Sequence, residues 1–144
     1  MAAFNKFQQF VGDVGLGVHN LDTGVLRIHL TNTAPVATNT VYNPSGGTND
    51  GPADLATGGG YTAKGVDTAA TYSQSGGTGS CVGTDVVWTA TTGFGPFRYV
   101  VLYNDTPTSP ADPLIGWWDY GSSITLLASE TFTTDFGATM FTIV

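Results

Sequence analysis

Residues 97–103 read FRYVVLY, a run dense in aromatic and β-branched side chains. Such side chains fit the pleated surface of a sheet, so the run predicts a β-strand. In a strand, Phe97, Tyr99 and Tyr103 fall on one face and Val100 on the other. Because both faces are largely apolar, we expect the strand to be buried on both sides, in a sandwich or against a partner.

The same alternation applies to the next apolar run, GWWDYG at residues 116–121. Neighbouring side chains of a strand point to opposite faces, so Trp117 and Trp118 are predicted to lie on opposite sides of the sheet. We expect one tryptophan to be in the core and the other to be exposed or in an interface.

Further short strands are predicted along most of the chain, separated by turns of Gly, Pro, Asn, Asp and Ser. The run SQSGGTGS at residues 73–80 is read as a glycine–serine loop. The predicted strands are residues 25–30, 61–66, 69–73, 85–91, 97–103, 114–120, 123–127, 131–136 and 139–144. This spacing predicts an all-β fold, a β-sandwich or jelly roll of about eight strands, in a single domain over residues 1–144.

One helix is predicted before these strands, over about residues 4–21. Its apolar side chains recur at a three–four spacing and form one stripe, which Phe10 widens. The glycines at 12, 15 and 17 weaken the second half of the helix. Two roles remain open: the helix covers one end of a sheet, or it docks on a neighbouring subunit. The residues of the stripe are Phe4, Phe7, Val11, Val14, Val18 and Leu21.

A long segment without periodicity, about residues 31–60, follows the first strand. It contains three prolines and ends in GGG, which is typical of a surface loop or of disorder. We expect this loop to lie over a neighbour's surface. In the preceding strand, Leu26 and Leu30 face the core, and His29 is placed on the outer face.

The composition excludes several classes of function. The chain has 144 residues with 4 basic and 11 acidic side chains, a net charge of −7, so no basic patch is available for nucleic acid or an anionic membrane. The single cysteine, Cys81, excludes an intrachain disulfide and a cysteine-rich metal site. The start MAAFNKFQQF lacks the pattern of a signal peptide, and no apolar run is long enough to span a bilayer. We expect synthesis in a cytoplasm without secretion.

Candidates for catalysis are few, and we expect no catalytic residues. Cys81 has no activating signature, and His19 and His29 are the only histidines that could pair with it. Asp119, between Trp118 and Tyr120, could act as a general acid if its aromatic surroundings raised its pKa, with Glu130 as a second carboxylate.

Metal and cofactor patterns are equally weak. The segment TNDGPAD at residues 48–54 offers only Asp50 and Asp54 to a calcium ion. The run TGGG at residues 57–60 is not followed by the lysine of a phosphate-binding loop. We therefore predict neither a metal nor a cofactor.

Two blocks of the chain resemble small virion proteins of tailed bacteriophages. The first is FNKFQQFVGDVGLGVHNL followed by VLRIHLTNTAPVATNT, and the second is GPFRYVVLYNDTPTSPADPLIGWWDYGSSITLLASETFTTDF. Together they cover residues 4–40 and 95–136. The resemblance implies a structural protein, in particular a capsid decoration (cement) protein, and implies no catalytic residues.

The expected function is therefore non-enzymatic: decoration and stabilisation of a phage capsid exterior, by a protein made in the cytoplasm of the bacterial host and located on the virion. The expected partners are the major capsid protein and further copies of the chain, as a homodimer or homotrimer, with no nucleic acid and no membrane. The alternative is a tail or receptor-recognition module that binds carbohydrate through exposed aromatics. A hydrolase using Asp119 or Glu130 is a third, weaker hypothesis. Candidate interface residues are Phe4, Phe7, Phe10, Tyr42, Trp117, Trp118 and Tyr120.

Overall fold

A computed structural model describes residues 2–144. The fold is mostly β, with one short helix and several antiparallel sheets, none of which closes into a barrel. The helix is α1 (Gln8–Gly15), and the strands are β1 (Phe4–Lys6), β2 (Leu26–Thr31), β3 (Val66–Asp67), β4 (Thr71–Ser75), β5 (Thr78–Val82), β6 (Val86–Thr89), β7 (Gly93–Asn104), β8 (Leu114–Leu127), β9 (Thr131–Thr134) and β10 (Phe141–Ile143).

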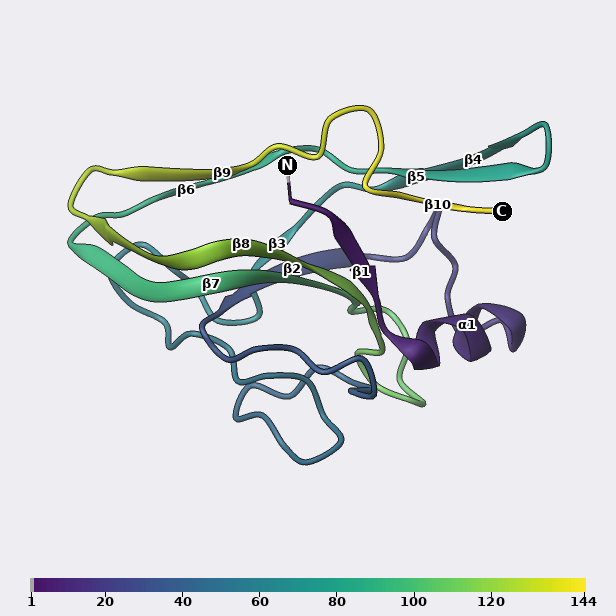
Figure 1. Cartoon of the computed structure of the whole chain (residues 1–144), viewed down its shortest axis with the longest axis horizontal. Helices are drawn as coiled ribbons and strands as arrows, with labels where there is room; N and C mark the ends of the chain where they lie inside the picture. The colour runs from purple at the N-terminus through teal and green to yellow at the C-terminus, as the bar shows by residue number, and fades with distance from the viewer. Residues whose placement is uncertain (1) are drawn as a thin grey trace.

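The largest sheet has five strands in the order β1-β8-β7-β2-β3 (Figure 1). Its centre is the long antiparallel pair β7 and β8, with Val100 opposite Trp118. FRYVVLY and GWWDYG therefore lie side by side. The predicted strands 114–120 and 123–127 form one continuous strand, β8.

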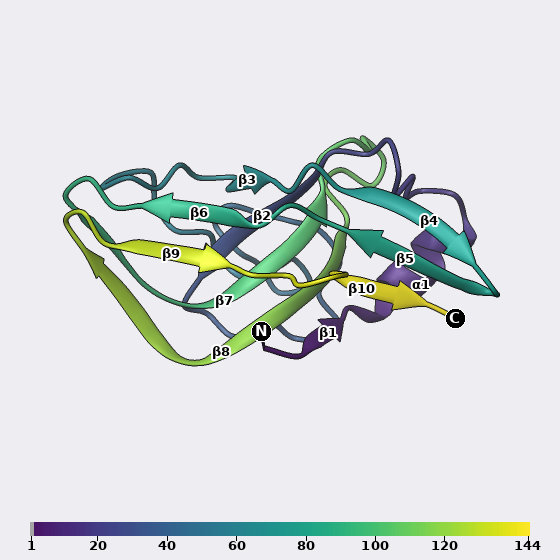
Figure 2. The ribbon, with the colours of Figure 1, turned by 90° about the horizontal axis from the view of Figure 1, so that it is seen from above.

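A second layer of strands lies over one face of this sheet (Figure 2). It consists of the pair β6-β9 and the three-stranded sheet β10-β5-β4. Only residues 83–85 separate β5 from β6, so the two sheets follow one another along the layer. The layers enclose the main hydrophobic core, in which Trp118, Phe97 and Ile28 are almost fully buried.

The opposite face of the five-stranded sheet is covered by the long loop, which lies below β7 and β2 in Figure 1. A smaller apolar cluster sits there, formed by Phe7, Tyr42, Val101, Tyr103 and Leu114. The expectation that residues 31–60 lie on a neighbour is therefore wrong for Tyr42, which packs on this chain's own sheet.

The outer-face placement of His29 is also wrong, because this loop covers that face of β2. The His29 side chain is 1% exposed, and its ring lies edge-on to that of Tyr42. The double-sided burial predicted for residues 97–103 is confirmed: Val100 and Leu102 belong to the main core, and Val101 and Tyr103 to the smaller cluster.

An irregularity in strand pairing accounts for one error within this strand. Phe97 lies in the main core together with Val100 rather than on the face of Tyr103. The β7–β8 register shifts between Phe97 and Tyr99, where one residue of β7 lies opposite four residues of β8. This break in regular pairing separates Phe97 from the alternating run at residues 100–103, and simple alternation does not anticipate it.

The predicted helix over 4–21 is corrected to a shorter one. Residues 4–6 form β1 and pair with β8, and Phe7 has extended backbone angles at the helix N-cap. The helix ends early because Gly17 adopts a φ of 73°, and the Val18 N–H donates to the Asp13 carbonyl. This pattern of a left-handed glycine followed by a six-to-one hydrogen bond terminates many helices.

The predicted loop over 73–80 is corrected to a hairpin. Residues 71–75 and 78–82 pair as β4 and β5, with Ser75 opposite Thr78. Gly76 and Gly77 both have positive φ angles, as a two-residue hairpin turn requires.

Within residues 2–144, no helix is long and apolar enough to cross a membrane.

Trp117 and Trp118 lie as predicted, one in the core and one partly exposed: Trp118 is 1% exposed, and Trp117 is partly exposed. Replacing Trp118 by alanine leaves a cavity between the layers, and we expect it to lower the free energy of unfolding by about 3–5 kcal/mol. Urea denaturation followed by circular dichroism measures the change. Trp117→Ala is the matched control, and a loss as large as that of Trp118→Ala would contradict this account of the core.

Candidate interaction surface

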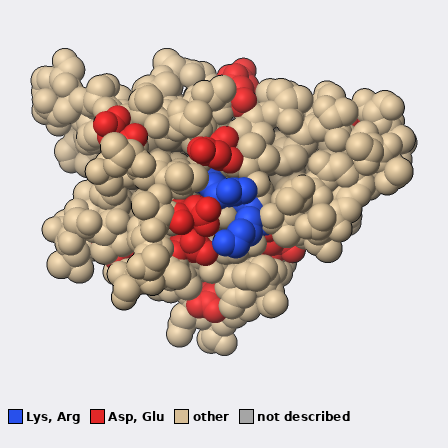
Figure 3. All heavy atoms as spheres, turned by 180° about the vertical axis from the view of Figure 1, so that it is seen from behind, with Lys and Arg blue, Asp and Glu red and all other residues tan. Residues whose placement is uncertain are grey.

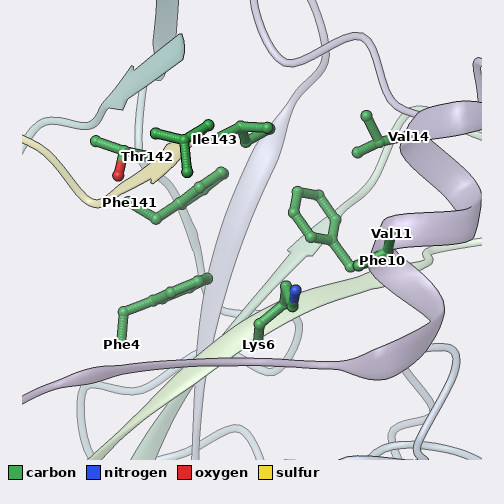
Figure 4. A pocket seen from close by; sticks show the side chains of 9 residues that line it. Phe4, Lys6, Phe10, Val11, Val14, Phe141, Thr142 and Ile143 are labelled. Atoms are coloured by element: carbon green, nitrogen blue, oxygen red, sulfur yellow. The ribbon is translucent and has the colours of Figure 1, made fainter. Parts of the chain in front are cut away.

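A groove lined mainly by apolar side chains lies between the N-terminal and C-terminal strands (Figure 4). Its volume is about 270 Å³. We call it the β1–β10 groove. Its lining residues are Phe4, Lys6, Phe10, Val11, Val14, Phe141, Thr142, Ile143 and Val144.

Three elements form the groove. The ring of Phe4 on β1 stacks on that of Phe141 on β10, with centroids 4.9 Å apart. Phe10 on α1 meets Phe141 edge-on at 5.6 Å, which holds the helix against the strands. The aromatic contacts therefore fix the base of the groove, while the more exposed Val11 lies on its rim.

Both strands beside the groove are sheet edges. β1 is the outer strand of the five-stranded sheet, and β10 is the outer strand of the three-stranded sheet. An edge strand presents unpaired backbone N–H and C=O groups to solvent. The groove thus combines an apolar lining with hydrogen-bonding groups, which few apolar surfaces offer.

Lys6 is the only charged side chain that lines the groove. The other basic residues are engaged: Arg27 with Asp105, Lys64 with Asp105 and Asp112, and Arg98 with Asp119. Within the described residues, Lys6 takes part in no ion pair. In a chain with a net charge of −7, the basic side chain without an ion-pair partner, Lys6, therefore lies at this groove.

Charged groups are sparse elsewhere on the surface. Figure 3 shows Lys and Arg atoms gathered in one place on the face it presents, with Asp and Glu atoms beside them. Most of that face is neither basic nor acidic. Surfaces with few charges lose little hydration energy when they are covered by another protein.

The predicted interface residues divide into two groups. Phe7, Phe10, Tyr42 and Trp118 are at most 6% exposed and fill this chain's own clusters, so their prediction as interface contacts is corrected. Phe4, Trp117 and Tyr120 remain partly exposed.

These three partly exposed residues do not form one surface. Phe4 lines the groove, and Tyr120 packs against Phe132 on β9. Trp117 lies on the loop side of the sheet, where its ring packs against Phe7 at 4.5 Å.

The lining residues of β10 were not predicted as contacts. The apolar C-terminal sequence FTIV indicated a strand, but its sequence carries no signal that Phe141 would meet Phe4. Lys6 likewise gave no signal, because the groove is created by the approach of two chain segments far apart in sequence. Val11 belongs to the predicted helical stripe, one of whose two open roles was docking on a neighbouring subunit.

The proposed role of Asp119 as a general acid is contradicted by its partner. Arg98 donates two hydrogen bonds to its carboxylate, 2.7 and 2.8 Å long, and lowers the pKa of Asp119. A general acid needs a raised pKa. Glu130 is used locally, since its Oε2 accepts the Leu127 N–H at 2.7 Å.

Cys81 and the two histidines are buried, and the two histidines have different partners. Cys81 is fully buried, and burial raises the pKa of its thiol to about 12. His19 lies beside Asn104 and Asp13, whereas His29 lies beside Asp54 under the loop.

Asp50 and Asp54, the two carboxylates that the sequence offers as a weak calcium pattern, are not directed at one point. Asp50 accepts a hydrogen bond from Asn43, and Asp54 points inward to the hydroxyls of Tyr42 and Tyr61. The described residues contain no cluster of three or more His, Cys, Asp or Glu side chains that could hold a metal ion.

Asp54 instead ties the loop to the sheet. Its carboxylate also accepts the Lys64 N–H and lies 3.4 Å from Nδ1 of His29. Burial alone would raise the pKa of Asp54, but the adjacent His29, the Tyr61 hydroxyl and the Lys64 N–H outweigh burial and lower it. The network is enclosed, and we assign it to structure.

No family model, no curated protein and no solved structure matches the chain. Its function is therefore inferred from its own residues, and the β1–β10 groove is the surface feature with a defined chemical character.

The enclosure of Cys81 predicts its reactivity. A buried thiol with a raised pKa is protonated and shielded at pH 8, so we expect Ellman's reagent to label Cys81 only after denaturation. Spectrophotometric titration of native and guanidinium-unfolded protein measures this difference. Rapid labelling of the native protein would contradict the burial of Cys81.

The Asp54 network predicts acid sensitivity. Because folding lowers the pKa of Asp54, its ionised form contributes stability that is fully present above the unfolded-state value of 3.8 and is lost as the pH falls through the lower folded value. We expect Asp54→Asn to cost about 2 kcal/mol at pH 6, and the cost to shrink as the pH approaches 3.

Urea denaturation at each pH measures these free energies. Asp50→Asn serves as the control in the same loop, and its cost should be smaller. A cost for Asp54→Asn that does not change with pH would refute the ionised role of Asp54.

Proposed function

We propose that the chain is a non-enzymatic structural protein that decorates a phage capsid through protein–protein contacts, with the β1–β10 groove as a contact surface. The groove carries this proposal, because it joins an apolar lining to unpaired strand edges. Apolar surface of this kind on a folded protein is typical of a binding site.

The weakly charged surface supports the same function. A subunit that remains assembled desolvates few ionic groups when charges are sparse. The resemblance to phage virion proteins, inferred from residues 4–40 and 95–136, is part of this same proposal. Many copies on a capsid multiply modest individual contacts by valency.

We also propose that the two strand layers form a single β-sandwich. β5 and β6 follow one another along one layer, and β9 and β10 do the same beside them. Such a framework has no need of a cofactor to fold, and it places the edges β1 and β10 at the same margin. Copies of the chain would associate as a homodimer or homotrimer on the capsid exterior.

The location is tested by cryo-electron microscopy of the purified virions that contain this chain, with an antigen-binding fragment as a marker. The proposal expects density on the capsid shell. Density confined to the tail would overturn capsid decoration and favour the receptor-recognition alternative, which glycan-array binding would then test.

The groove is tested with one matched pair of variants. Val11 in the groove is 56% exposed, and Val87 on β6, outside it, is 57% exposed. We expect Val11→Asp to weaken co-sedimentation with capsids at least tenfold, because it places a carboxylate on an apolar contact. Val87→Asp should have little effect, and equal effects of the two variants would overturn the assignment.

A further inference from the structure

We propose that the β1–β10 groove binds an extended peptide segment that adds a strand to β1, places apolar side chains in the groove and sets a carboxylate against Lys6. Only the origin of the peptide segment rests on the proposed function: the segment would belong to an assembly partner. Three observations define the site: the direction of the backbone groups of β1, the direction of its side chains, and the charge of the groove.

The first observation is the direction of the free backbone groups on β1. The Phe7 N–H donates to the Ile115 carbonyl in the same register that pairs Asn5 with Trp117. Hydrogen-bonded pairs alternate along an antiparallel ladder, so Asn5 faces β8, and Phe4 and Lys6 direct their N–H and C=O groups outward. An added strand can therefore form up to four backbone hydrogen bonds at these two residues.

The second observation concerns the side chains of the same two residues. Phe4 and Lys6 point into the groove, as Figure 4 shows, whereas alternation directs Asn5 to the other face. Every second side chain of an added strand would enter the groove beside Phe4. Strand addition with pockets for alternate side chains is an established mode of peptide recognition.

The third observation is the charge. Lys6 is the only charged side chain among the lining residues, which are otherwise apolar except for Thr142, and Lys6 takes part in no ion pair within residues 2–144. Opposite charges directly across two strands stabilise a sheet, and like charges destabilise it. The matching segment is therefore one with an acidic residue opposite Lys6 and apolar residues two positions away on either side.

The probe is the capped peptide Val-Thr-Glu-Thr-Val, whose alternate side chains are apolar, acidic and apolar. Titration into the ¹⁵N-labelled full chain should shift the backbone amides of Phe4 and Lys6. Replacing the central glutamate by lysine should weaken binding about fivefold, and N-methylation of the glutamate should weaken it about tenfold.

The complementary variant is Lys6→Glu, which should reverse the preference between the glutamate and lysine peptides. Asn5→Asp changes the charge of β1 on the opposite face and should leave that preference unchanged. Lys6 and Asn5 are both exposed, so neither variant disturbs the core.

Three outcomes would overturn the inference: no binding of any peptide, binding that is indifferent to the central charge, or shifts centred on Thr142 of β10 instead of β1. The capsid experiment tests the proposed function, and its failure can be distinguished from failure of the peptide-binding inference. Charge-dependent peptide binding by a chain that is absent from capsid shells would retain the site and reject the proposed function. Capsid binding that depends on Val11 without peptide binding would do the reverse.

Discussion

The burial of both faces of the β7–β8 pair is the constraint on which the rest of the structure depends. Val100 and Trp118 point to one side of this pair, and Val101 and Tyr103 to the other. A sheet that is apolar on both faces needs two covers. The single short helix covers neither face, so one is covered by a second layer of strands and the other by a loop.

The long loop covers the second face of the sheet, and its hydrogen bonds follow from that position. A strand satisfies its backbone groups in a ladder, whereas a buried loop needs other partners for its polar groups. Backbone groups supply several of them: the Tyr42 N–H donates to the Asp112 carbonyl, and the Leu55 N–H donates to the Leu30 carbonyl. Asp54 adds side-chain ties, accepting hydrogen bonds from the Tyr42 and Tyr61 hydroxyls and from the Lys64 N–H. The same contacts bury His29, which explains how a residue in an alternating strand pattern comes to have no exposed face.

This division also explains what the sequence could predict. Periodicity is local, so it located most strands, the burial of residues 97–103 and the placement of Trp117 and Trp118 on opposite faces of one strand. The loop contacts join residues far apart in the chain, and no local pattern encodes the meeting of Tyr42 with His29 or of Phe4 with Phe141. Phe4 itself fits a helical stripe, but pairing with β8 outweighs that propensity. The groove was missed for the same reason.

The shortage of charge acquires a more specific meaning in the folded chain. Arg27, Lys64 and Arg98 are neutralised by neighbouring aspartates, which leaves Lys6 as the cation available to a partner. The net charge of this protein is negative, so its long-range field would not attract an acidic partner segment. Recognition of such a segment at the groove would depend instead on a short-range contact with Lys6. Specificity would then come from the register of an added strand, because a shift of one residue moves its acidic side chain away from Lys6 and turns its apolar side chains out of the groove.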